Sequence, residues 1–150
     1  MRKIFLTGLT LAGILFSGCA TVTMEPKEVS DKAKLFNPPS EGNAGIYIFR
    51  DSIVGTTLVK SVWVNDKFIG RTAIKTFFYE EVQGGQEHKI STESEFSPND
   101  LHLAVKEGKH YFIRQYIKPG LVIGGANLEI VEEKEGREII SVLEMAKKLN

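Results

Sequence analysis

The order of hydrophobic and polar positions divides the chain into three parts. Nearly every residue from Ile4 to Phe16 is apolar or small, whereas residues 20–43 are mostly polar and are interrupted by prolines. From Ala44 onward, short runs of β-branched and aromatic residues alternate with turn residues, as is typical of β-strands. The pattern predicts an apolar leader, a polar connecting segment and one β-rich domain.

The β-rich part is predicted to be an antiparallel β-sandwich, because its apolar runs are short and closely spaced. We expect about seven or eight strands. The run at His88 is read as the strand that returns after the run at Phe77. The clearest runs are Ile46–Phe49, Val62–Val64, Phe77–Tyr79, His88–Ser91, Leu101–Val105, Tyr111–Tyr116 and Leu128–Val131.

A further hairpin is predicted around Glu107-Gly108. It would join the run Leu101–Val105 to the run Tyr111–Tyr116. With a three-residue loop and Gly108 in the left-handed region, Leu103 and Tyr111 would face one another inside the sandwich.

After Gly136 the apolar residues follow a helical spacing. This spacing places them on one stripe of a helix over about residues 137–149, and a strand through Ile139–Leu143 is the alternative. The predicted fold is therefore mainly β, a single antiparallel β-sandwich over residues 44–150 with a C-terminal helix packed on it. The residues of the stripe are Ile139, Val142, Leu143, Ala146 and Leu149.

The start of the chain combines positive charge, a short apolar run and a cysteine. Arg2 and Lys3 precede the run, which ends at Phe16 and is about 20 Å long as a helix. That length is shorter than the roughly 30 Å hydrocarbon core of a bilayer, so the run is predicted to be a secretory signal. Ser17-Gly18-Cys19 follows directly and resembles the bacterial lipobox, in which the cysteine thiol receives a lipid.

This resemblance implies a division of the N-terminal part. Residues 1–18 would be a lipoprotein signal peptide, and residues 19–43 would be the lipidated cysteine and a flexible tether. Ala20 stands where an aspartate would indicate retention in the inner membrane, so the expected location is the periplasmic side of the outer membrane. An ordinary signal peptide followed by a free thiol at Cys19 is the alternative.

Charge and cysteine content narrow the classes of function. The 19 basic and 19 acidic residues of the whole chain become 17 and 19 when Arg2 and Lys3 leave with the signal peptide, a net charge of −2. Such a chain has no broad attraction for nucleic acid. Because Cys19 is the single cysteine, no disulfide can form within the chain, and an apolar core must supply its stability.

Four stretches of the chain stand out: Ala44-Gly45-Ile46-Tyr47-Ile48-Phe49-Arg50, Val62-x-Val64-Asn65-x-x-x-Ile69-Gly70, Phe78-Tyr79-x-x-x-x-Gly84-Gly85-x-x-His88 and Gly108-Lys109-x-Tyr111-Phe112. Together they resemble the domain of unknown function 2846 family, a group of bacterial envelope proteins that are often lipoproteins. The resemblance covers about residues 43–135, and part of it is also similar to PEGA-type and carboxypeptidase-regulatory-like modules, which are small β-sandwiches associated with extracellular binding. It implies a fold and brings no known activity.

The hairpin after Val64 departs from the family pattern. The family usually has Asn-Gly at this turn, whereas this chain has Asn65-Asp66 followed by Lys67. A two-residue type I′ turn needs positive φ at both central residues, which aspartate accepts less readily than glycine. We therefore expect a loop over residues 65–67.

The three histidines are the candidates for a metal or hydrolytic site. The predicted hairpin would place His102 and His110 on one face, about 7–8 Å apart at the backbone, with His88 elsewhere. No spacing supplies the third ligand of a zinc site or a nucleophile with its base. We therefore expect no catalytic residue, metal ligand or cofactor, and keep an envelope enzyme with a cryptic hydrolytic or metal site near the histidines as the alternative.

A binding surface is the stronger prediction. The side chain of Trp63 points away from those of Val62 and Val64 in an extended strand. If the valines face the core, Trp63 lies outside, where it could contact a sugar ring or a protein together with Tyr47 or Tyr79; its burial under the C-terminal helix or in the second face of the sandwich is the alternative. The expected function is that of a non-catalytic binding or structural module, with an envelope protein or glycan as partner.

Overall fold

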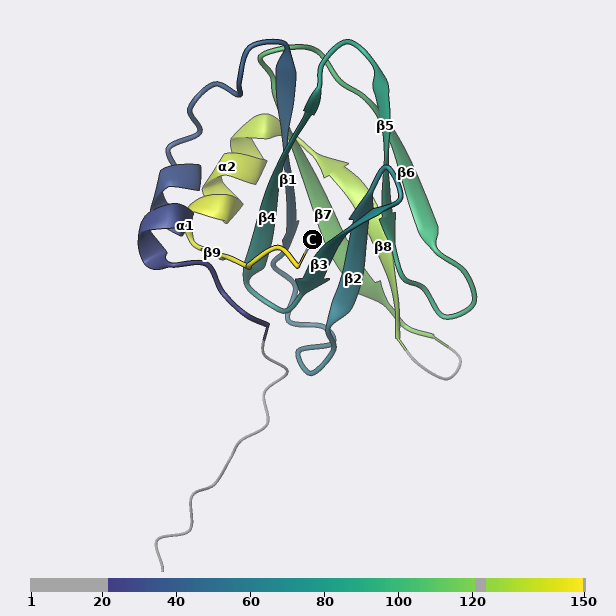
Figure 1. Ribbon diagram of the computed structural model, residues 1–150. Coiled ribbons are helices and arrows are strands. Elements are labelled where there is room, and N and C mark those ends of the chain that lie inside the picture. Colours follow the sequence, from purple (N-terminus) through teal and green to yellow (C-terminus); the bar gives the residue numbers. More distant parts are fainter. Residues whose placement is uncertain (1–21, 121–123, 150) are drawn as a thin grey trace, which may run out of the picture.

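The described part of the chain consists of two β-sheets and two short helices. The computed structural model describes residues 22–120 and 124–149. The elements are α1 (Lys27–Ala33), β1 (Asn43–Arg50), β2 (Lys60–Val64), β3 (Lys67–Thr72), β4 (Thr76–Gln83), β5 (Glu87–Thr92), β6 (Asn99–Ala104), β7 (His110–Lys118), β8 (Gly125–Val131), α2 (Glu133–Ser141) and β9 (Glu144–Met145). The sheets face each other, and both helices lie on the outer side of the sheet that contains β1 and β4 (Figure 1).

The two-sheet, mainly β architecture is confirmed, but the prediction of a wholly antiparallel sandwich is wrong. The sheet β3-β2-β5-β6 is antiparallel throughout. The sheet β8-β7-β1-β4-β9 is mixed, because β1 pairs with β7 in parallel and β4 pairs with β9 in parallel. Alternation of apolar residues predicts which side chains are buried, whereas strand direction depends on how the chain crosses between the sheets.

Two strand pairs predicted from neighbouring runs do not form. β4 pairs with β1 and β5 with β2, so the chain changes sheet after Gln83 instead of returning beside itself. It changes sheet again after Ala104, because β6 pairs with β5 whereas β7 pairs with β1. Leu103 and Tyr111 still contribute to the same core, although they reach it from opposite sheets.

The connections at these crossings bind to other segments. The N–H of Gly85 donates to the carbonyl of Val105 (2.9 Å), and the N–H of Gly108 donates to the carbonyl of Asn43 (2.8 Å). Gly84 lies against the backbone of Glu107, where a Cβ would be 2.8 Å from the Glu107 nitrogen. The glycines therefore allow two connections to pack together at one end of the sandwich.

The first hairpin is confirmed, with a tighter turn than predicted. Val64 pairs with Lys67, so the loop consists of Asn65 and Asp66 alone. Their φ values of 50° and 64° are both in the left-handed region, as a type I′ turn requires. The Asn65 N–H donates to the Lys89 carbonyl (2.8 Å), and its side-chain oxygen accepts from the Lys89 N–H (3.1 Å). These bonds stabilise the turn without a glycine.

The C-terminal helix begins and ends earlier than predicted. α2 covers residues 133–141, whereas the apolar stripe predicts a helix over 137–149. Beyond Val142 the chain is extended: the Ala146 N–H donates to the Phe77 carbonyl (2.9 Å) and the Leu149 N–H donates to the Ile69 carbonyl (2.9 Å). β4 and β3 have unpaired backbone groups at this edge. Pairing with them therefore satisfies the hydrogen-bonding groups of this segment's backbone better than a longer helix would.

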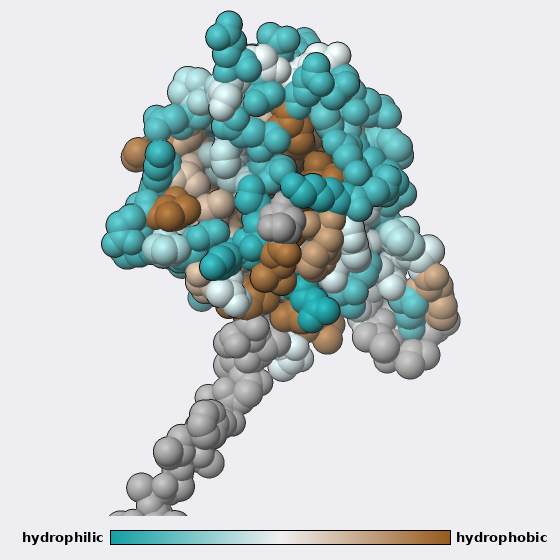
Figure 2. Space-filling view, in the orientation of Figure 1, coloured by the Kyte–Doolittle hydropathy of each residue, from teal (hydrophilic) through white to brown (hydrophobic). Residues whose placement is uncertain are grey.

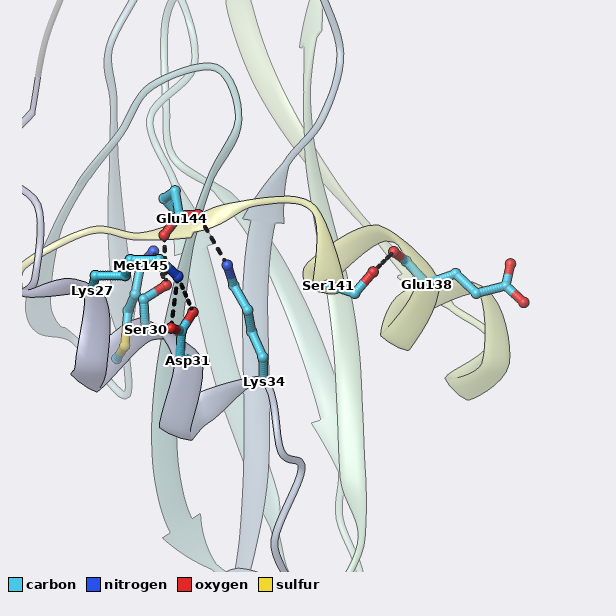
Figure 3. A network of polar contacts seen from close by, with 8 residues as sticks. All are labelled: Lys27, Ser30, Asp31, Lys34, Glu138, Ser141, Glu144 and Met145. Atoms are coloured by element: carbon cyan, nitrogen blue, oxygen red, sulfur yellow. Dashed lines mark hydrogen bonds and ion pairs between the residues drawn. The ribbon is translucent and has the colours of Figure 1, made fainter.

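The polar segment expected to be a flexible tether instead lies against the domain from residue 22 onward. Its backbone pairs with the C-terminal segment through Glu25 N–H to the Met145 carbonyl (2.9 Å). In α1, the buried Ser30 hydroxyl donates to Glu144 (3.0 Å) and accepts from the Met145 N–H (3.0 Å), as Figure 3 shows. Lys34 adds an ion pair with Glu144 (3.1 Å). Only Cys19, Ala20 and Thr21 of the predicted tether lie outside the described residues.

Two apolar layers lie on the two sides of the mixed sheet. We call them the inter-sheet layer and the helix-side layer. Alternate residues of β1 enter each layer, with Ile46 and Ile48 in the first and Tyr47 and Phe49 in the second. β1 is therefore buried on both faces, which explains its continuous apolar sequence.

Candidate functional site

The three residues predicted to form a binding surface are divided between two places. Tyr47 and Tyr79 lie together on the helix side of the mixed sheet, where β1 and β4 pair them directly. Trp63 lies on the outer face of the β3-β2-β5-β6 sheet, because Val62 and Val64 on either side of it are buried in the inter-sheet layer. The two tyrosines and the tryptophan therefore form separate candidate sites.

The two tyrosines line a pocket of about 340 Å³ between the N-terminal segment and β4. Their ring centroids are 4.7 Å apart. Tyr47 is 1% exposed, and its hydroxyl donates to the Ala33 carbonyl (2.8 Å). Val29, Pro38 and Met145 complete the apolar wall. The N-terminal segment thus forms one side of the pocket and is held there by Tyr47.

Glu81 is the acidic group of this tyrosine pocket. It accepts a hydrogen bond from the Tyr79 hydroxyl (3.0 Å), and its second oxygen accepts from the Ser40 N–H (3.1 Å). Partial burial alone would raise the pKa of Glu81, but the hydrogen bonds from Ser40, Tyr79 and Asn43 outweigh it and hold the pKa below its usual value. The carboxylate is therefore ionised and fixed in place at neutral pH.

The tyrosine hydroxyls remain protonated at neutral pH. Burial raises the pKa of Tyr47 to about 12. Burial also raises the pKa of Tyr79, and the hydrogen bond to the Glu81 carboxylate raises it further. Both hydroxyls thus serve as hydrogen-bond donors.

His110 and Gly45 lie next to the two tyrosines of the pocket. A Cβ on Gly45 would lie 2.6 Å from the His110 ring and 2.7 Å from the Tyr79 ring, so glycine is needed for this close approach. The His110 ring lies 5.6 Å from the Tyr47 ring, and its Nδ1 is 3.4 Å from an Arg137 nitrogen. Burial, together with the charge of Arg137, lowers the pKa of His110. The neutral imidazole can then accept from Arg137.

Trp63 lines a shallower hollow of about 230 Å³. The half-buried indole packs on Phe68, with centroids 5.8 Å apart. Charged groups surround it: Lys89 pairs with Asp66 at 2.6 Å, and Asp100 also lines the hollow. No described helix covers this sheet (Figure 1), so the alternative of a tryptophan buried under the C-terminal helix is wrong. We call this place the Trp63 hollow.

The three histidines have separate environments. His88 is buried, with Nδ1 2.8 Å from the Asn65 amide nitrogen and Nε2 2.7 Å from the Gln83 carbonyl. His102 is exposed and lies 3.0 Å from Glu87. The predicted diagonal pair of His102 and His110 is absent because β6 and β7 belong to different sheets. Among residues 22–120 and 124–149, no group of three or more His, Cys, Asp or Glu side chains could hold a metal ion.

Sequence reasoning missed Glu81 and the N-terminal wall of the tyrosine pocket. Glu81 follows Tyr79 by two residues in β4, and that spacing places both side chains on one face of a strand. Alternation could therefore have identified Glu81. Nothing local in residues 29–38 indicates which part of the sheet they cover, since that contact depends on the position of Met145.

Comparisons with known proteins identify relatives of the chain but name no activity. An uncharacterized protein from Haemophilus influenzae is 54% identical over 133 residues, covering 89% of this chain and 79% of the relative. No solved structure matches the chain. Within the described part of the chain, no helix has the length and apolar character needed to cross a bilayer. The family model described as "Protein of unknown function (DUF2846)" matches residues 40–126, more than half of the chain. The chain therefore belongs to the DUF2846 family.

Proposed function

We propose that this protein is a bacterial envelope lipoprotein, held at the periplasmic side of the outer membrane by lipid on Cys19. It acts there as a non-catalytic binding or structural module. The observation that carries the proposal is the order of the first residues: Arg2-Lys3, a short apolar run to Phe16, then Ser-Gly-Cys. These residues lie outside the described part of the chain, so their sequence alone supports the anchor.

The tyrosine pocket supports a structural role for its own polar groups. The Tyr47 hydroxyl donates to a backbone carbonyl of the N-terminal segment, and the Tyr79 hydroxyl donates to Glu81. Glu81 in turn accepts from the Ser40 N–H. Each group thereby joins the N-terminal segment to the sheet, which favours the binding or structural reading over acid–base chemistry.

The Trp63 hollow is the better contact surface for a partner. An indole face beside carboxylate and ammonium groups can stack on a sugar ring and bind its hydroxyls, or serve as a hot spot for a protein. The ion pair of Lys89 with Asp66 fixes the charged rim next to Trp63. We propose an envelope glycan or protein as the occupant.

The anchor is tested by metabolic labelling with a palmitate analogue in a Gram-negative host. The wild-type chain should be labelled and recovered in the outer-membrane fraction, whereas Cys19→Ala should be unlabelled and should keep its signal peptide. A Ser17→Ala variant is the matched control and should still be labelled. Equal labelling of wild type and Cys19→Ala would refute the anchor.

The hollow is tested by intrinsic fluorescence, because Trp63 is the single tryptophan of the chain. Soluble peptidoglycan fragments should shift or quench its emission in a saturable way. Asp100→Ala should weaken the response because it removes one wall of the hollow, and Glu107→Ala on a distant exposed connection should not. If no fragment changes the emission, a photoreactive residue at Ser91, used in intact cells, should crosslink a protein instead. Absence of both signals would reject the hollow as a binding site.

A further inference from the structure

Exposed apolar residues occupy two connections at one end of the sandwich. Ile53 and Val54 in the β1–β2 connection are 76% and 54% exposed, and Phe96 in the β5–β6 connection is 80% exposed. We call these three residues the apolar tips. Both connections lie at the lower end in Figure 1, the end at which the described chain begins. Figure 2 shows hydrophobic residues gathered at this same end.

The two connections rest on a shared support. A Cβ on Gly55 would lie 3.0 Å from the Ile117 side chain near the end of β7. In the other connection, the Glu93 carbonyl accepts from the Ala126 N–H (3.2 Å) at the start of β8. Since β7 and β8 pair at Lys118 and Gly125, both connections pack beside the paired ends of these two strands and form a continuous end.

A buried cation holds the β1–β2 connection in shape. The Arg50 side chain is 0% exposed, and its guanidinium donates to the carbonyls of Leu58 (2.6 Å), Val54 (3.4 Å) and Gly55. A buried guanidinium is retained only where hydrogen bonds compensate its desolvation. The loop is therefore fixed by its backbone carbonyls while the side chains of Ile53 and Val54 stay in solvent. Their exposure is a property of an ordered loop.

We propose that the apolar tips insert into the interfacial region of the bilayer to which Cys19 is attached. The inference rests on the proposed anchor and adds an orientation to it. Cys19 and Val22 are three residues apart, so their Cα atoms can be separated by at most about 11 Å. Val22 already packs on the inter-sheet layer. The domain is therefore held at the lipid surface by this end.

The charges at this end are compatible with a lipid surface. The Asp51 carboxylate is paired with Arg114 (3.2 Å), and the Glu93 carboxylate accepts from the Ser61 N–H (2.9 Å). Lys75 and Lys118 are exposed in the β3–β4 connection and at the end of β7. Amines at this level attract the phosphates of lipid headgroups, while aliphatic and aromatic tips enter the boundary with the acyl chains.

Depth of insertion is measured on the mature chain coupled through its Cys19 thiol to a maleimide phospholipid. Coupling in vitro makes the test independent of lipidation in the cell. The vesicles contain phosphatidylethanolamine, phosphatidylglycerol and a brominated phospholipid that quenches tryptophan. In a Trp63→Phe background, the probe Phe96→Trp should be quenched and its emission shifted to the blue. The matched probe Glu107→Trp, on an exposed connection at the other end, should be unaffected. Equal behaviour of the two probes would overturn the proposal.

A second experiment uses the untethered Cys19→Ser chain and co-sedimentation with the same lipids without bromine. Replacing Ile53, Val54 and Phe96 by serine should lower the vesicle partition coefficient about tenfold or more. The matched control replaces Leu35, Ile130 and Val142, which are 67%, 56% and 76% exposed on other elements, and should leave partition unchanged.

The outcomes separate the inference from the proposed function. One outcome is that partition into vesicles depends on the apolar tips while Cys19 is not labelled in cells. This outcome would support the membrane-facing end and refute the anchor. Normal labelling of Cys19 without quenching at position 96 would refute the membrane-facing end alone. If the Cys19→Ser chain instead forms dimers that the tip substitutions dissociate, and does not bind vesicles, the end contacts a second copy and the proposal is overturned.

Discussion

The two sides of the mixed sheet bury different residues from different parts of the chain. Except for Leu128 and Ala146, the buried residues of the inter-sheet layer fall within the family-matched span 40–126 and are largely aliphatic. The helix-side layer is rich in aromatic rings from the strands, and residues outside that span complete it. Those residues are Ala33, Phe36, Val131, Ile139, Ile140, Leu143 and Met145.

This difference shows that the family-matched span supplies most of the sandwich, β1 to β7, but leaves one of its faces uncovered. Without the flanking segments, the rings of Tyr47, Phe49, Phe77 and Phe112 would be exposed to water. The segment before β1 covers them through Phe36, whose ring lies 5.4 Å from Tyr47 and 6.1 Å from Phe112. The tyrosine pocket therefore exists only when the flanking segments are docked.

The largest expected effect on stability concerns two neighbouring residues that enter different layers. Phe77 and Phe78 are both 0% exposed, but Phe77 enters the helix-side layer and Phe78 the inter-sheet layer. Phe78→Ala should lower the free energy of unfolding by about 3–5 kcal/mol. Phe77→Ala should cost less, because the short helices can settle into the space more easily than two sheets can approach. Urea unfolding of the Cys19→Ser chain measures both, and a greater loss for Phe77→Ala would reverse the comparison.

The inter-sheet layer can be examined further on β6, where buried and exposed residues alternate. Leu103 is 4% exposed, whereas His102 beside it is exposed. Leu103→Ala should lower the free energy of unfolding by about 2–5 kcal/mol, and His102→Ala should change it by less than about 0.5 kcal/mol. Denaturant midpoints in the opposite order would mean that β6 presents its other face to the core.

The docking of α2 on the helix-side layer is tested at Gly136. A Cβ there would lie 2.2 Å from Cγ of Phe112, so Gly136→Ala should displace the helix or the ring. We expect a loss of about 1–3 kcal/mol in the free energy of unfolding. In an exposed helix the same change would stabilise by about 1 kcal/mol. Glu138→Ala on the exposed side of α2 is the control, and a stabilised Gly136→Ala variant would argue against the docked helix.

The smallest expected effect is a pH dependence that arises from His110, whose ring packs against Tyr47 of the helix-side layer. Because burial and Arg137 lower the folded-state pKa of His110, the unfolded chain binds the proton more readily. Stability is therefore fully present above the unfolded pKa of about 6.5 and is lost as pH falls below it. The free energy of unfolding should decrease from pH 7.5 to pH 5.5 by a larger amount in the wild type than in His110→Gln. Identical slopes for wild type and His110→Gln would exclude His110 as the cause.

Part of the fold follows from local sequence. The spacing of apolar residues in β2, β6 and β7 predicts core residues such as Val62, Leu103 and Ile113, and the sequence predicts the turn at Asn65-Asp66 to within one residue. These features were accessible because each depends on a window of a few residues, in which side-chain period and backbone preference act directly.

The tertiary structure decided which strands pair and which residues outside the sandwich cover it. Residues 144–149 have a helical apolar spacing, yet they are extended because free backbone groups of β4 and β3 bind them. Residues 22–36 have a polar composition, yet they dock on the domain. Ser30 binds the backbone of Met145, and Phe36 packs on Phe112 of β7, and both partners are more than seventy residues away in the sequence. The sequence by itself determined the faces of the strands. Edge pairing and docking were decided by long-range hydrogen bonds and burial, which exist only once the sheets are assembled.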